Sequence, residues 1–160
     1  MIGEYPTVGC LMLLEKASFQ SLESVVQALQ PTTAIGIEPD PTDNVQYGHA
    51  MLGGSQLEML ALVQEAGDVT AVHIEFDEAD VTRIAQQTGL SFEQLFMPYV
   101  QAAKAVPGVL AIGVGFELSP PSDFYTETIQ EAGIAVLFER DEEHKSWSRQ
   151  QTMPLVGHYG

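Results

Sequence analysis

Residues 7–15, TVGCLMLLE, form a nearly continuous apolar run. A strand with one solvated face alternates apolar and polar residues, whereas a strand that is buried on both faces is apolar throughout. We therefore expect residues 7–15 to be a central strand of a sheet, with the rest of the domain packed around it.

Two later segments predict strands with two distinct faces. Residues 69–77, VTAVHIEFD, alternate in polarity, which predicts a half-buried strand whose polar face is made by His73, Glu75 and Asp77. Residues 109–118, VLAIGVGFEL, place large apolar side chains on one face and small residues on the other. A face of small residues lets a helix pack closely on a sheet.

Helices are predicted where apolar residues recur at intervals of three or four. Ser91 and Gln94 have the spacing of a capping box at a helix N-terminus. Gly53-Gly54 is a turn that we expect to connect a strand to a helix. The predicted helices cover residues 18–30, 55–66, 78–88, 91–105 and 122–132, and further strands are predicted at 33–38, 45–52 and 134–140.

The interleaving of helices and strands predicts one α/β (α+β) domain, built on a mixed sheet of five or six strands with packed helices. With 160 residues, of which 45% are hydrophobic, the chain is long enough to bury a core without disulfide or metal support. We expect this domain to cover residues 1–140. Residues 141–160 are polar and poorly patterned, and we expect them to be a C-terminal extension whose order the sequence leaves open.

The formal net charge of −16 limits the partners of the protein. Binding to nucleic acid or to an anionic membrane needs clustered basic residues, and the six Lys and Arg residues are scattered. We therefore expect neither partner. An acidic surface attracts a basic protein, although acidity also serves solubility alone. No secretory signal and no apolar run of about 18 residues is visible, so we expect a cytoplasmic protein.

The best chemical constellation in the sequence is the polar face of residues 69–77. An imidazole and carboxylates could bind a divalent metal, so His73 and Glu75, with His49 from the glycine-rich segment YGHAMLGG, are the candidate metal ligands. Residues along one strand span too far to chelate one ion, so a ligand from another strand would be needed. The alternative is a solvent-facing polar surface. No catalytic set is assembled, we expect no cofactor, and Cys10 is predicted to be a small buried hydrophobe.

Two local concentrations of acidic residues are candidates for binding a basic protein. They lie in EFDEAD at residues 75–80 and in DEE at residues 141–143, and Trp147 follows the second one. An exposed Trp is a common interface anchor, although Trp147 could instead fold back onto the domain. The candidate partner-binding residues are Asp77, Glu78, Asp80, Asp141, Glu142, Glu143 and Trp147.

Three segments carry a resemblance to known proteins: CLMLLEKASFQSLESVVQAL at 10–29, VTAVHIEF at 69–76 and FMPYVQAAKAVPGVLAIGVGFELSPPSDFY at 96–125. With them the chain resembles small bacterial α/β families of unknown function, some of which are encoded near polymorphic toxins. No catalytic motif defines these families, so the resemblance assigns no functional residue. It implies protein binding of the kind that immunity proteins perform.

These observations lead to three hypotheses of function. The first is a non-enzymatic acidic interaction module that binds a basic protein, as an inhibitor or an immunity protein does. The second is a small metal-dependent enzyme or ligand-binding domain that uses His49, His73 and Glu75. The third is a homodimer that buries an apolar sheet face or an edge strand.

Overall fold

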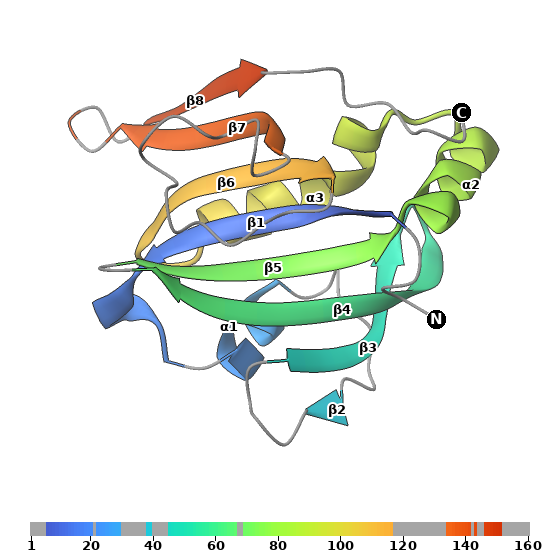
Figure 1. Cartoon of the computed structure of the whole chain (residues 1–160). Coiled ribbons are helices and arrows are strands. Elements are labelled where there is room, and N and C mark those ends of the chain that lie inside the picture. Colours follow the sequence, from blue (N-terminus) through green and yellow to red (C-terminus); the bar gives the residue numbers. More distant parts are fainter. Residues whose placement is uncertain are drawn as a thin grey trace.

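The fold is a single α+β domain built on one antiparallel sheet, here described from a computed structural model (Figure 1). The structure describes residues 6–20, 22–29, 38–39, 45–66, 69–116, 134–141, 143 and 146–151. The sheet has the strand order β2-β3-β4-β5-β1-β6-β7-β8. Its strands are β1 (Thr7–Glu15), β2 (Glu38–Pro39), β3 (Val45–Leu52), β4 (Ser55–Ala66), β5 (Val69–Asp77), β6 (Val109–Phe116), β7 (Ile134–Asp141) and β8 (Ser146–Gln151).

The α+β class and the single domain are thus confirmed, but the predicted mixed sheet of five or six strands is wrong. Seven strands have six or more residues, and two-residue β2 extends the sheet at one edge. Every neighbouring pair of strands is antiparallel. The prediction counted too few strands because it assigned one strand to a helix and overlooked another.

The apolar run at residues 7–15 is the central strand, as predicted. β1 pairs with β5 on one side and with β6 on the other, so Cys10 lies between Ile74 and Val114. Seven of its nine residues are buried. Cys10 and Met12 face the helices, whereas Leu11 and Leu13 face the opposite side of the sheet. A strand with apolar neighbours on both faces has no position that favours a polar side chain.

The helices that were predicted at 78–88 and 91–105 are confirmed as α2 (Glu78–Thr88) and α3 (Phe92–Lys104). Ser91 caps α3, since its hydroxyl accepts from the Gln94 amide at 3.1 Å and the Gln94 side chain accepts from the Ser91 amide at 2.8 Å. This is the predicted capping box. The helix predicted at 18–30 is shorter: a 3₁₀ turn, η1 (Lys16–Ser18), precedes α1 (Leu22–Ala28).

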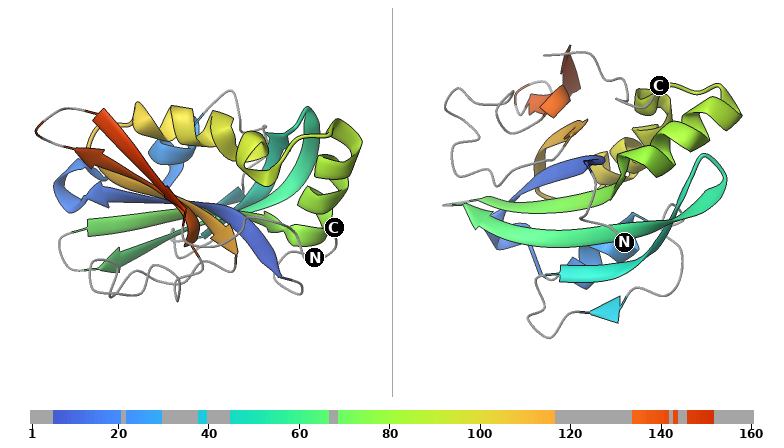
Figure 2. Two further views of the ribbon diagram at one scale, coloured as in Figure 1. Left: turned by 90° about the horizontal axis from the view of Figure 1, so that it is seen from above. Right: turned by 45° about the vertical axis from the view of Figure 1, so that its right-hand side comes forward.

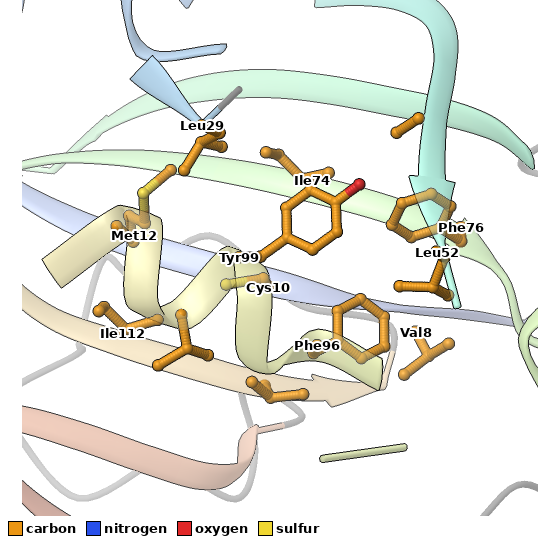
Figure 3. Close-up of a cluster of buried hydrophobic side chains, with 14 of the residues drawn as sticks. Val8, Cys10, Met12, Leu29, Leu52, Ile74, Phe76, Phe96, Tyr99 and Ile112 are labelled. Carbon is orange, nitrogen blue, oxygen red and sulfur yellow. The ribbon is translucent and has the colours of Figure 1, made fainter. Parts of the chain in front are cut away.

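The main core lies between the sheet and α2 and α3, which cover one face (Figure 2). At its centre the Phe76 ring lies 5.8 Å from that of Phe96 and 6.1 Å from that of Tyr99, measured between centroids (Figure 3). A smaller apolar cluster lies on the other face, which we call the second face. This cluster consists of Leu11, Leu13, Val69, Ala71, Ala111 and Leu137, with Leu110 packed against it.

The helix predicted at 55–66 is wrong, because this segment is β4. Leu, Met, Ala, Glu and Gln favour a helix, but Gly53 and Gly54 have φ of 59° and 84°. Two residues with positive φ form the tight turn of a β-hairpin, which returns the chain antiparallel to β3. In a strand the same sequence places Leu57, Met59 and Ala61 in the main core. Burial between two partner strands outweighs helix propensity here.

The remaining predictions concern strands. Those predicted at 45–52, 109–118 and 134–140 are confirmed as β3, β6 and β7. β8 was not predicted; it pairs with β7 from Val136↔Gln151 to Asp141↔Ser146, so this part of the expected extension belongs to the sheet. The predicted helix at 122–132 lies outside the described residues, as does the predicted strand at 33–38, apart from Glu38 in β2.

The hairpin turn allows a test with a matched control. A Cβ at Gly53 would lie 2.7 Å from Ile84 Cγ2 and 2.8 Å from Leu95 Cδ2, whereas a Cβ at Gly54 would meet nothing within 4 Å. Gly54→Ala should therefore cost only backbone strain, about 1 kcal/mol. Gly53→Ala adds crowding against α2 and α3 and should lower the free energy of unfolding by about 2 kcal/mol. Urea denaturation of both variants measures the difference, and equal losses would contradict the close packing.

Candidate functional site

The second face of the sheet carries a row of polar side chains on β5. His73, Glu75 and Asp77 lie on it together, as the alternation predicts. The prediction that this face is solvated is wrong, because all nine residues of β5 are buried. His73, Glu75 and Asp77 are 1%, 7% and 9% exposed. A buried polar group is costly unless hydrogen bonds compensate it, so these three residues need an explanation.

Glu75 is held by its neighbours on β1. The Thr7 hydroxyl donates to Glu75 Oε1 at 3.1 Å. Gly9 is the residue directly opposite Glu75, and its missing side chain leaves the space that the Glu75 side chain occupies. A Cβ at Gly9 would lie 3.1 Å from Glu75 Cγ. Because Gly9 has no side chain, the Glu75 side chain has room beside β1 on the second face.

His73 has no such support. It lies between Leu62 of β4 and Leu11 of β1. Neither of its ring nitrogens has a hydrogen-bond partner in the part of the chain that the structure describes, and the same holds for Oε1 of Gln64, its diagonal neighbour on β4. Burial lowers the pKa of His73 from 6.5 to about 4, because an apolar setting disfavours the charged form. The imidazole is therefore neutral at pH 7.

The three candidate metal ligands are not brought together. His49 lies on β3 opposite Glu58, whereas His73 lies two strands away opposite Leu62 of the intervening β4. That register separates the two histidines by about 13 Å along the strands and about 10 Å across them. Within the described ranges, no three His, Cys, Asp or Glu residues are placed to hold a metal ion. Cys10 is buried, as predicted, and burial raises its pKa to about 12.

The candidate acidic residues divide into buried and exposed ones. Asp77 and Glu78 are 9% and 0% exposed, so they are not part of an acidic surface. They mark the junction where β5 ends and α2 begins. Asp80, in the first turn of α2, is 3.4 Å from Arg83. Asp141 and Glu143 are exposed at the β7–β8 connection, and Glu142 lies outside the described residues.

Trp147 of β8 is half-buried and packs against the main core. The ammonium of Lys104 lies 5.8 Å from its ring and 5.1 Å from the ring of Phe138. These distances fit cation–π contacts. Trp147 thus lies back against the domain, which was the alternative to an exposed interface anchor.

Most of the described basic side chains are engaged within the chain. Arg149 forms a two-point ion pair with Glu93, with Nε to Oε2 at 2.9 Å, which lowers the pKa of Glu93. Lys16 lies 3.9 Å from Glu65, and Arg83 and Lys104 have the partners given above. Among the described residues, the exposed carboxylates Glu15, Glu58, Glu139 and Glu143 have no ion-pair partner.

The structure has a further surface that the sequence does not predict, because the composition of residues 55–66 favours a helix. β3 and β4 together expose a face that points away from the helices. We call it the outer hairpin face, and it consists of Tyr47, His49 and Met51 of β3 and their opposite residues Leu60, Glu58 and Gln56 of β4. Leu60 is half-buried and the other five are exposed. The Gly-Gly turn between two alternating runs was the signal that could have revealed it.

Comparison with known proteins adds no relative. The chain matches no protein-family model, no curated protein and no solved structure. No helix in the described part of the chain has the length and hydropathy needed to cross a membrane. The assignment of a function therefore depends on the chemistry of the chain itself.

Proposed function

We propose that the protein is a non-enzymatic interaction module whose acidic surface binds a basic protein, as an inhibitor or an immunity protein does. The observation that carries this proposal is the imbalance of charge at the surface. Four of the five described basic side chains are used within the domain, whereas exposed carboxylates on both hairpins have no ion-pair partner among the described residues.

The carboxylates that support this proposal differ from those expected from the sequence. Asp77 and Glu78 are buried, so reversing their charge would test folding rather than binding. Glu58 on β4, Glu139 on β7 and Glu143 beyond β7 are exposed. Exposed charges of one sign accelerate the encounter with an oppositely charged partner, and salt weakens that attraction.

The proposal predicts salt-sensitive capture of a basic protein. The immobilised protein is incubated with lysate of its source cell at about 50 mM and about 500 mM salt, and bound proteins are identified by mass spectrometry. We expect one basic protein whose recovery falls at least about tenfold at high salt. Recovery of only acidic or neutral proteins, or recovery that salt leaves unchanged, would contradict the proposal.

A matched pair of triple variants tests whether the carboxylates act locally. Glu58→Gln, Glu139→Gln and Glu143→Gln raise the net charge by three, and so do Gln86→Lys, Gln87→Lys and Gln101→Lys at exposed helix positions. We expect the first set to weaken binding clearly more than the second. Equal effects would mean that the partner responds only to total charge.

A further inference from the structure

The outer hairpin face combines exposed apolar side chains with a carboxylate. Tyr47 and Met51 are 50% and 37% exposed, and they are two of the three large hydrophobic residues exposed among the described residues. Both lie on the same side of β3, with exposed His49 between them. Exposed apolar side chains that gather on one surface are more informative than scattered ones, because they mark interaction sites.

The strand register places one carboxylate at the centre of this face. Glu58 lies directly opposite His49, so Tyr47 and Met51 are its two diagonal neighbours on β3. Diagonal neighbours on antiparallel strands are about 7–8 Å apart, which long and aromatic side chains can span. Glu58 is exposed and has no ion-pair partner in the described ranges. The face therefore has a negative charge between an aromatic ring and a thioether.

We propose that the outer hairpin face binds an arginine side chain of the basic partner. The guanidinium would pair with the Glu58 carboxylate and stack on the Tyr47 ring, while the methylene stem would lie against Leu60, which is opposite Tyr47. Arginine fits this arrangement better than lysine because its planar cation can pair with a carboxylate and stack on an aromatic ring at once. This inference rests on the proposed function and names the surface that performs it.

Charge complementarity favours a partner over a cation of the chain itself. Lys16 and Arg149 have their own carboxylates, and Lys104 lies over two rings on the helix-covered side. Arg83 pairs within α2. The remaining described cation, Arg140, lies on β7, five strands away from β3 in the sheet order. No described lysine or arginine is therefore paired with Glu58, whose neighbours on β3 are Tyr47, His49 and Met51.

A titration with a defined peptide tests the site. The probe is an acetylated nine-residue peptide of alternating arginine and serine, added to ¹⁵N-labelled protein and followed by amide chemical shifts. We expect the largest shifts at residues 47–51 and 56–60. Tyr47→Ser and Glu58→Gln should each weaken the apparent Kd about threefold, and both together about tenfold. Gln86→Lys raises the net charge by one at an exposed position of α2, as Glu58→Gln does on β4, and this matched control should leave the Kd unchanged.

Several results would overturn the site. One is a set of shifts confined to other strands, and another is no shift at all. A third is a lysine peptide that binds as tightly as the arginine peptide. A dimer in light scattering that Tyr47→Ser dissociates would show that a second copy covers this face.

If the Tyr47→Ser/Glu58→Gln variant captures the basic protein from lysate as well as the wild type does, the site is wrong and the proposed function stands. If the wild type captures none, the proposed function fails.

Discussion

Gly9→Ala should strongly destabilise the folded domain. A Cβ at this position would lie 2.2 Å from the Ile74 carbonyl oxygen and 2.9 Å from Glu75 Cα. Both are backbone atoms of the neighbouring strand, so neither can move without shifting the ladder between β1 and β5. We expect the free energy of unfolding to fall by about 3 kcal/mol. For a chain of this size that corresponds to a melting temperature about 6–12 °C lower.

A double variant separates the two sources of this strain. Glu75→Ala removes Cγ, which would lie 3.1 Å from the new methyl group, but leaves the carbonyl contact in place. We therefore expect Glu75→Ala to leave most of the Gly9→Ala defect uncorrected in thermal and urea denaturation. Full rescue would mean that only the side chain of Glu75 requires a glycine. A Gly9→Ala protein as stable as the wild type would show that the strands lie farther apart than described.

Acidification should destabilise the domain through His73. The pKa of His73 is about 4 in the folded protein, compared with the ordinary value of 6.5 in the unfolded chain. As the pH falls, the unfolded chain therefore binds the proton before the folded protein does. Stability from this residue is fully present above about pH 6.5 and is lost as the pH falls toward 4. A difference of that size corresponds to about 3 kcal/mol at full effect. Among the described residues on this face, the titratable group nearest to His73 along the chain is Glu75, two positions further along β5.

The pH effect is measured by urea denaturation at about pH 7.5, 6.0 and 4.5. His73→Leu places a side chain like those of Leu11 and Leu62 between them, and it should flatten the pH dependence while keeping the stability at pH 7.5. His49→Ala is the control, since that side chain is exposed and should leave the slope unchanged. An identical slope in wild type and His73→Leu would exclude His73 as the source.

The strands with the clearest pattern were the predictable part of the fold. Residues 7–15 are a nearly continuous apolar run and form β1, which lies between β5 and β6 in the sheet. The capping box of Ser91 and Gln94 located the start of α3, because a local hydrogen-bond pattern depends on no distant residue. β4 was missed for the opposite reason: its composition favours a helix, and only pairing with β3 and β5 makes it a strand.

The site was less predictable than the fold. Alternation along residues 69–77 correctly placed His73, Glu75 and Asp77 on one face, but it could not reveal that this face is buried. A polar residue within an alternating strand normally faces solvent, and the sequence contains no sign of the contrary. Asp77 and Glu78 were expected at the surface because charged residues are seldom fully buried. Their burial where β5 meets α2 depends on tertiary packing.

The placement of β1 has a consequence for the order of events during synthesis. The ribosome makes this apolar strand before its partners β5 and β6, which end only at Asp77 and Phe116. About 100 further residues must therefore be translated before both edges of β1 are paired, which takes on the order of 5–20 s. During that interval the nascent chain exposes a segment that favours aggregation. We expect chaperones that bind short apolar segments to recognise residues 7–15 before the sheet closes.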